Sequence, residues 1–128
     1  MTFSHFEDIQ IWQKARDLSK HVFELTAEGN VTKDYRFCDQ IRASSGSVMD
    51  NIAEGFEREG NKEFIQFLYI AKGSCGETRS QSYRAFDNNY INEQQLNQLI
   101  EKTKNLSIDI ANFIKYLKNS GIRGNKYK

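Results

Sequence analysis

The chain has 128 residues, of which 38% are hydrophobic and 27% are charged, and it contains no proline. This length supports one domain, and the composition excludes collagen-like and intrinsically disordered chains. The formal net charge is +1, so the chain lacks the strong overall positive charge that is typical of many nucleic-acid-binding domains. Charge is nevertheless uneven, because residues 1–64 carry 8 basic and 12 acidic side chains whereas residues 65–128 carry 10 and 5.

Four long segments of helical character are separated by short turns rich in glycine and asparagine. Because no proline interrupts these segments, each can form one continuous helix. The predicted helices cover residues 6–28, 33–57, 62–87 and 92–119. Four helices of similar length with short connections predict an all-α fold, an antiparallel up-down-up-down four-helix bundle. The bundle is expected over residues 1–120, and residues 121–128 form a short basic tail.

Polar residues that commonly cap helices stand at the start of each segment. In a Ser-x-x-Glu or Asn-x-x-Gln spacing, each of the two side chains satisfies a free backbone N–H group of the first turn. We therefore expect helix starts at these capping residues: Ser4 with Glu7, Thr32, Asn61, and Asn92 with Gln95.

Apolar residues of the last segment recur at alternating spacings of three and four, which predicts a seam that wraps left-handedly. This seam comprises Leu96, Leu99, Thr103, Leu106, Ile110, Phe113 and Leu117. A narrower stripe in the second segment comprises Phe37, Ile41, Ser45, Val48, Ile52 and Phe56. Both stripes are predicted to form the bundle core, and the separated Cys38 and Cys75 are expected to be free buried thiols.

The third segment is apolar nearly all round its helix, whereas a helix of a monomeric bundle buries one stripe. One interpretation is a second buried face that contacts another copy of the chain, through Phe64, Phe67, Tyr69 and Ile70. The alternative is a bulky core with one or two exposed aromatic side chains. The following small residues, Gly73 to Gly76, predict close approach of another backbone, since interior glycines cost a helix about 1 kcal/mol each.

Motifs for catalysis are absent from the sequence. It contains no phosphate-binding loop, no HExxH motif and no nucleophile elbow, and the two histidines, His5 and His21, are too few for an all-histidine zinc site. We therefore expect a non-enzymatic protein without metal or cofactor. Neither a secretory signal nor an apolar run of about 20 residues is visible, so a cytoplasmic location is expected.

A stripe of polar residues lies beside the apolar stripe of the second segment, at spacings of four, three and four: Gln40, Ser44, Ser47 and Asn51. Such a stripe predicts a row of hydrogen bonds between helices or between copies, and a ligand or nucleic-acid contact is the alternative.

Basic residues of the second half are candidates for phosphate contacts, although solvated helix faces would have the same composition. The candidates are Lys72, Arg79, Arg84, Lys102, Lys104, Lys115, Lys118, Arg123, Lys126 and Lys128.

Three stretches of the chain, Phe6–Ala15, Gln40–Phe56 and Lys62–Ser74, resemble a known bacterial family. The family consists of four-helix-bundle proteins encoded within intervening sequences of 23S ribosomal RNA genes. The resemblance implies a left-handed antiparallel bundle that assembles as a homopentamer. Its motif positions are Arg42, Ser47, Asn51, Glu54 and Gly55, which the resemblance implies are structural. One departure is Met49, where the family usually has proline, so a straighter second helix is expected.

Two classes of function follow from these observations. The first is a homo-oligomeric scaffold that associates with ribosomal or other structured RNA through a basic surface. An accessory factor of a retroelement reverse transcriptase, a role of similar proteins, is a special case of it. The second is a protein–protein adaptor ring without any nucleic-acid contact. No small-molecule substrate and no membrane partner are expected.

Overall fold

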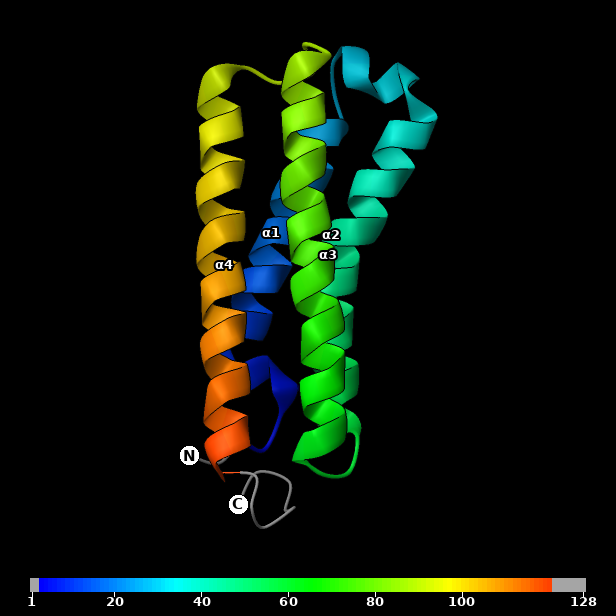
Figure 1. Ribbon diagram of the computed structural model, residues 1–128. Coiled ribbons are helices and arrows are strands. Elements are labelled where there is room, and N and C mark those ends of the chain that lie inside the picture. The colour runs from blue at the N-terminus through cyan, green and yellow to red at the C-terminus, as the bar shows by residue number, and fades with distance from the viewer. Residues whose placement is uncertain (1–2, 121–128) are drawn as a thin grey trace.

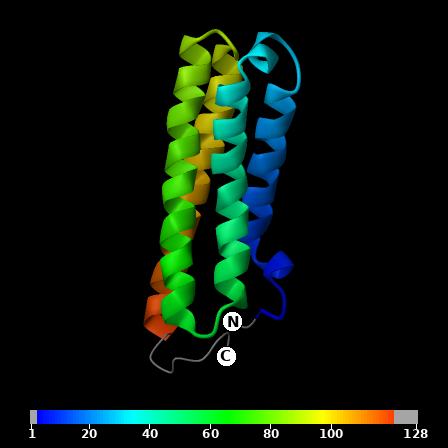
Figure 2. The same ribbon diagram turned by 90° about the vertical axis from the view of Figure 1, so that its right-hand side faces the viewer.

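The structure is a computed structural model that describes residues 3–120, and it is all-α, with four long helices and no strand in that part of the chain. The long helices are α1 (Gln10–Thr26), α2 (Tyr35–Glu57), α3 (Asn61–Asp87) and α4 (Glu93–Ser120), and two short 3₁₀ turns, η1 (Phe6–Asp8) and η2 (Asn30–Lys33), precede α1 and α2. Figures 1 and 2 show the helices side by side in a bundle. No helix within residues 3–120 has an apolar stretch that could span a bilayer.

Contacts between helix ends fix how the helices lie. The start of α3 is beside the end of α4, where the Asn61 side chain donates to the Leu117 carbonyl oxygen at 3.3 Å. The start of α2 is beside the end of α1, where the Cys38 thiol and the Arg42 guanidinium both reach the Thr26 carbonyl oxygen. Helix α1 therefore packs against α2 and α3 against α4, and α2 also packs against α3.

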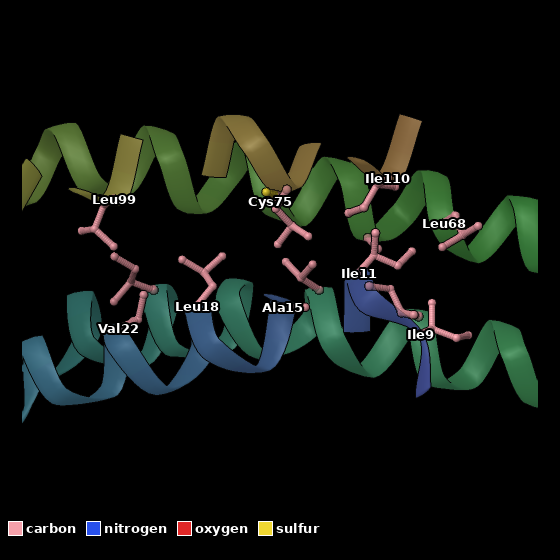
Figure 3. Close-up of a cluster of buried hydrophobic side chains, with 14 of the residues drawn as sticks. Ile9, Ile11, Ala15, Leu18, Val22, Leu68, Cys75, Leu99 and Ile110 are labelled. Atoms are coloured by element: carbon pink, nitrogen blue, oxygen red, sulfur yellow. The ribbon is translucent and has the colours of Figure 1, made fainter. Parts of the chain in front are cut away.

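The core runs along the bundle between the helices, as the side chains of Figure 3 show. All six residues of the stripe predicted in α2 are buried, which confirms that stripe. The seam predicted in α4 is confirmed at six of its positions. At the seventh, Phe113 is only half-buried and Ile114 is buried instead; the Phe113 ring lies at the edge of the core, against the buried Phe64 and the less buried Phe3 and Tyr116.

The first helix starts later than predicted, and the expected box of Ser4 and Glu7 does not form. The residues around it make the η1 turn, which has no side-chain cap. Ile9 then adopts an extended backbone and is buried, so it separates η1 from α1. Burial of one large aliphatic side chain stabilises a fold by about 1.5–3 kcal/mol, which exceeds the typical contribution of one cap.

The second and third helices start within two residues of the predicted positions, but their capping residues differ from the prediction. Thr32 lies in η2, where its hydroxyl donates to the Gly29 carbonyl, and α2 is capped by Asp34, which accepts from the Phe37 N–H. The Tyr90 hydroxyl also donates to Asp34, at 2.6 Å, and this hydrogen bond is the largest cause of the lowered pKa of the Asp34 carboxyl.

At the start of α3 the cap position belongs to Gly60, whose φ of 87° favours glycine. Asn61 instead lies inside the helix with a buried side chain, because its amide group donates a hydrogen bond to the Leu117 carbonyl oxygen of α4. Only the predicted box at α4 is confirmed: Asn92 and Gln95 each accept the backbone N–H of the other at 2.8 Å.

Candidate nucleic-acid interface

Helix α3 has two flanks, each made of residues that share one side of the helix. The α2 flank comprises Phe67, Ile70, Ser74, Gln81 and Arg84, and the α4 flank comprises Tyr69, Lys72, Gly76, Arg79 and Tyr83. Residues at such spacings of three and four lie above one another on a helix. The two flanks differ in what they contact.

The α2 flank is joined to α2 by a row of side-chain hydrogen bonds. Ser44 bonds Gln81 at 2.5 Å and Thr78 at 2.8 Å, and both partners of this buried set lie on α3. Ser74 donates to Ser47 at 3.0 Å. Three of the four predicted stripe residues, Gln40, Ser44 and Ser47, therefore bond α3, whereas Asn51 bonds Ser47 within α2.

A groove of about 570 Å³ runs outside this row between α2 and α3. Its lining is small or polar: Gln40, Ala43, Ser44, Ser47, Ser74, Glu77, Ser80, Gln81 and Arg84. At one end, Arg84 donates to Gln40 at 3.2 Å, so its guanidinium is held on this side of α3 and away from the α4 flank.

Close packing of α2 on α3 depends on Gly55. A Cβ at this position would lie 2.7 Å from the Phe67 Cβ and 2.8 Å from the Phe64 ring. By contrast, a Cβ on Gly73 or Gly76 would meet nothing within 4 Å in the described residues. The close approach expected at Gly73 and Gly76 is therefore wrong for contacts within one chain, and Gly55 takes that role.

The four apolar residues predicted as an interface of α3 separate into three places. Phe64 is 0% exposed and packs edge-on against Phe56 and Phe113, so it is a core residue and its assignment to a subunit interface is corrected. Phe67 is half-buried, with the Arg58 guanidinium 4.9 Å from its ring centre. Tyr69 and Ile70 are 50% and 52% exposed, Tyr69 on the α4 flank and Ile70 on the α2 flank.

The α4 flank continues onto α4 and forms a basic surface. The Lys118 ammonium donates to the Tyr69 hydroxyl at 2.9 Å and lies 5.4 Å from the centre of its ring. The side of helix α4 that carries Lys118 therefore lies next to the α4 flank of helix α3. Lys104 and Lys115 share the Lys118 side of α4 because they precede it by 14 and 3 residues. We call this surface the basic face: Lys72, Arg79, Lys104, Lys115 and Lys118, with Tyr69 and Tyr83.

Cations of the basic face have no carboxylate within 4.0 Å in residues 3–120. The ion pairs of that part of the chain join Lys14 to Asp109, Glu54 to Arg58, and Asp17 to Lys102. Glu101, one turn before Lys104, is the nearest acidic residue along α4. A row of unpaired cations with two exposed tyrosines can bind phosphate groups by charge and hydrogen bonding.

Comparisons with known proteins identify the family. A sequence model described as 23S rRNA-intervening sequence protein matches residues 7–112. The chain belongs to this family. A solved structure of a protein with unknown function from the S23 ribosomal protein family of Bacteroides thetaiotaomicron has a TM-score of 0.74 and 20% sequence identity. The match covers 82% of this chain and 98% of that chain, which shows a shared fold, and no curated protein matches the sequence.

Of the basic residues predicted to contact phosphates, five lie on the basic face and two lie elsewhere in the described residues. Lys102 points towards α1, where it pairs with Asp17 at 2.9 Å, and Arg84 belongs to the α2 flank. Arg123, Lys126 and Lys128 lie outside the described residues. The sequence reasoning missed Tyr83, although its spacing of four from Arg79 could have placed it on the same side of α3.

The motif residue Arg42 connects α2 to α1 by hydrogen bonds. The Arg42 guanidinium donates to the Thr26 hydroxyl at 2.8 Å and to the Thr26 carbonyl oxygen at 3.1 Å. It also lies 4.5 Å from the centre of the Phe23 ring. Arg42 is therefore occupied by contacts within the chain.

The other motif residues of α2 have contacts of different kinds, and Glu54 is exposed. Asn51 donates to both the backbone oxygen and the hydroxyl of Ser47 at 2.8 Å, and Glu54 pairs with Arg58. Gly55 is the close contact described above, and α2 continues through Met49 without a break.

The two cysteine thiols are buried. Cys38 and Cys75 are free, as expected, and burial raises the pKa of the Cys75 thiol to about 11, which keeps it protonated and unreactive. Within residues 3–120 no group of three or more histidine, cysteine or acidic side chains is placed to hold a metal ion.

Proposed function

We propose that this 23S rRNA-intervening sequence protein is a non-enzymatic, homo-oligomeric scaffold that binds structured RNA through the basic face. The observation that supports this function is the gathering of five cations without carboxylate partners around two exposed tyrosines. Neutralising phosphates with such side chains releases counterions, which gives affinity even in a protein whose net charge is close to zero.

Binding to a structured ribosomal RNA fragment tests the RNA part of this function. A double variant, Lys72→Glu with Arg79→Glu, reverses two charges of the basic face, and we expect its affinity to fall at least about tenfold at low salt. Lys20→Glu is the matched control, because Lys20 is exposed on α1 and lies away from the basic face. Fluorescence anisotropy with labelled RNA measures the change. No binding by the unmodified chain at about 50 mM salt, or an equal loss in the control, contradicts the proposal.

The proposed assembly is a homopentamer of left-handed, antiparallel up-down-up-down bundles. The stoichiometry comes from the family resemblance, and the contacts between helix ends support the antiparallel order. The exposed Ile70 supports a contact between copies on the α2 flank, because the groove on this flank includes the small residues Ala43, Ser47 and Ser74, which admit a neighbouring helix.

Light scattering tests this assembly. The unmodified chain should have about five times the 14.9 kDa mass of one copy. Ile70→Glu should reduce the mass, whereas Tyr69→Glu, on the other flank, should leave it unchanged. A single-copy mass for the unmodified chain at high concentration contradicts the scaffold.

A second candidate function is a protein–protein adaptor ring without nucleic-acid contact. The groove between α2 and α3 favours it, since an open groove with hydroxyl, amide and charged groups can receive a partner segment. Purification from nuclease-treated lysate separates the two functions, because an adaptor retains its partner and an RNA-bridged complex loses it. A role beside a retroelement reverse transcriptase is a special case of the first function.

A further inference from the structure

The cations of the basic face form two straight rows on rigid supports. The row on α4 runs from Lys104 to Lys118, which is about 21 Å at the rise of an α-helix, and Lys72 and Arg79 on α3 are about 10 Å apart. Packed helices have axes about 8–10 Å apart, so the rows are separated by a similar distance. The ligand must therefore present phosphates over an extended, stiff surface.

Single-stranded nucleic acid fits this surface poorly. Proteins that bind single strands combine a charged groove with aromatic rings on which bases stack. Here one of the two exposed tyrosine rings, that of Tyr69, already has the Lys118 ammonium against it. Two cavities among the described residues, of about 570 and 470 Å³, are lined by residues outside the basic face, in the groove beside α2 and between the N-terminal segment and α4.

The basic face is too wide to enter a DNA major groove and contact the bases there. That groove is about 12 Å wide and admits one α-helix. Two helices side by side, each about 10 Å across, present a face of about 20 Å. The basic face can therefore lie across a shallow groove but cannot enter a deep one.

These dimensions and groups fit double-helical RNA. The minor groove of A-form RNA is wide and shallow and displays ribose 2′-hydroxyls between two lines of phosphates. The Tyr69 oxygen accepts from Lys118, so its own O–H remains able to donate to a ribose hydroxyl. Gly76, between Lys72 and Arg79, leaves open space where a ribose can approach the helix.

We infer that the basic face binds double-helical RNA across its minor groove, through phosphates and 2′-hydroxyls and without regard to base sequence. This inference rests on the proposed function and specifies its ligand.

The direct test compares three labelled ligands of the same length and sequence with the full chain: an RNA duplex of about 16 base pairs, its single strand and the corresponding DNA duplex. We expect the RNA duplex to bind at least about tenfold more tightly than either of the others, because only it offers both the A-form spacing and the 2′-hydroxyls. Five phosphate contacts predict a slope of about −4.5 in a plot of log K against log salt concentration.

The outcomes of this comparison are distinguishable. Binding to none of the three ligands overturns the proposed function itself. Tighter binding to the single strand, or equal binding to DNA and RNA duplexes, overturns the inference and leaves the RNA-binding function in place.

Two variants assign the effect to the basic face. Tyr69→Phe removes only the hydroxyl, so the ratio of the affinity for the RNA duplex to the affinity for the DNA duplex should fall about fivefold. Lys72→Ala should weaken binding to every duplex and reduce the salt slope by about 1. Lys20→Ala on α1 should change neither quantity, and an unchanged slope and RNA preference in both face variants overturns the inference.

Discussion

The two flanks of α3 are made by one helix and differ in how their polar groups are satisfied. On the α2 flank, hydroxyl and amide groups bond α2, and the one cation, Arg84, is held by Gln40. On the α4 flank, Lys72 and Arg79 have no carboxylate partner within residues 3–120, and a lysine of α4 joins them across Tyr69. Short polar side chains bring two helices together, and long cationic ones leave a surface for another molecule.

The difference follows from side-chain size. Serine, glycine and alanine allow α2 and α3 to pack closely, and the buried hydroxyls then find partners on the facing helix because water is excluded. Lysine and arginine cover the neighbouring apolar surface with their methylene chains while their charged ends stay in water. One flank therefore contributes to stability, whereas the other is available for binding.

The largest predicted effect comes from the residue that lies between the flanks. Phe64→Ala should lower the free energy of unfolding by about 3–5 kcal/mol, because it leaves a cavity in place of the ring that contacts both Phe56 and Phe113. Tyr69→Ala, on the exposed α4 flank, should change it by less than about 0.5 kcal/mol. Urea denaturation measures both, and similar losses would place Tyr69 in the core with Phe64.

A pair of glycine variants sharpens the comparison, since they should have opposite signs. Gly55→Ala should destabilise the fold by about 2 kcal/mol, because the new methyl group overlaps the Phe67 Cβ and the Phe64 ring. Gly76→Ala should stabilise it by up to about 1 kcal/mol, because alanine favours the helix and space is open there. Thermal midpoints that shift in the same direction for both variants contradict this account.

The hydrogen-bond row of the α2 flank should give a smaller loss. Ser44→Ala leaves the Gln81 carbonyl oxygen and one bond of Thr78 unsatisfied in a buried site, so the free energy of unfolding should fall by about 1 kcal/mol. Ser80→Ala is the control, because Ser80 is exposed in the same groove. Equal midpoints for the two variants in urea would mean that the row does not stabilise the contact between α2 and α3.

The smallest effect is a pH dependence that arises outside both flanks. Burial, followed by the charge of Lys102, lowers the pKa of the His21 imidazole, whereas Asp17 and Glu24 oppose the shift. Its Nδ1 atom is buried without a partner in the described residues. Because the pKa of His21 is lower in the folded chain than in the unfolded chain, the unfolded chain binds a proton at a higher pH. The contribution of His21 to the free energy of unfolding is therefore complete above about pH 6.5 and is lost as the pH falls through the lower folded-state pKa.

Urea midpoints at about pH 7.5 and pH 5.5 measure this dependence, and His21→Gln should reduce it. Neither flank contains a histidine, so RNA affinity should remain nearly constant over the same range. An RNA affinity that follows the His21 titration would contradict the separation of stability from binding.

The helices and most of the core could be predicted because their signals are local. The spacing of Leu96, Leu99 and Thr103 depends only on the turn of a helix, and the box of Asn92 and Gln95 spans four residues. The predicted capping role of Asn61 was wrong because a distant contact decided it: Asn61 turns inwards since α4 offers the Leu117 carbonyl, and no pattern near Asn61 contains that information.

The candidate site was predictable only as a set of residue types. Lys72 and Lys102 are equally basic in the sequence, but one lies on the basic face and the other pairs with Asp17. In the same way, the apolar run of α3 includes both a core residue, Phe64, and an exposed one, Ile70.

By itself, the sequence determined the helical class, the seam of α4, the polar stripe of α2 and the family. The tertiary structure decided which side of each helix meets a neighbour, and therefore which cations are paired, which glycine is a close contact and where the basic face lies. The physical reason is that helix formation depends on neighbours within a few residues. Pairing of charges and exclusion of water depend on segments that the fold brings together from far apart in the chain.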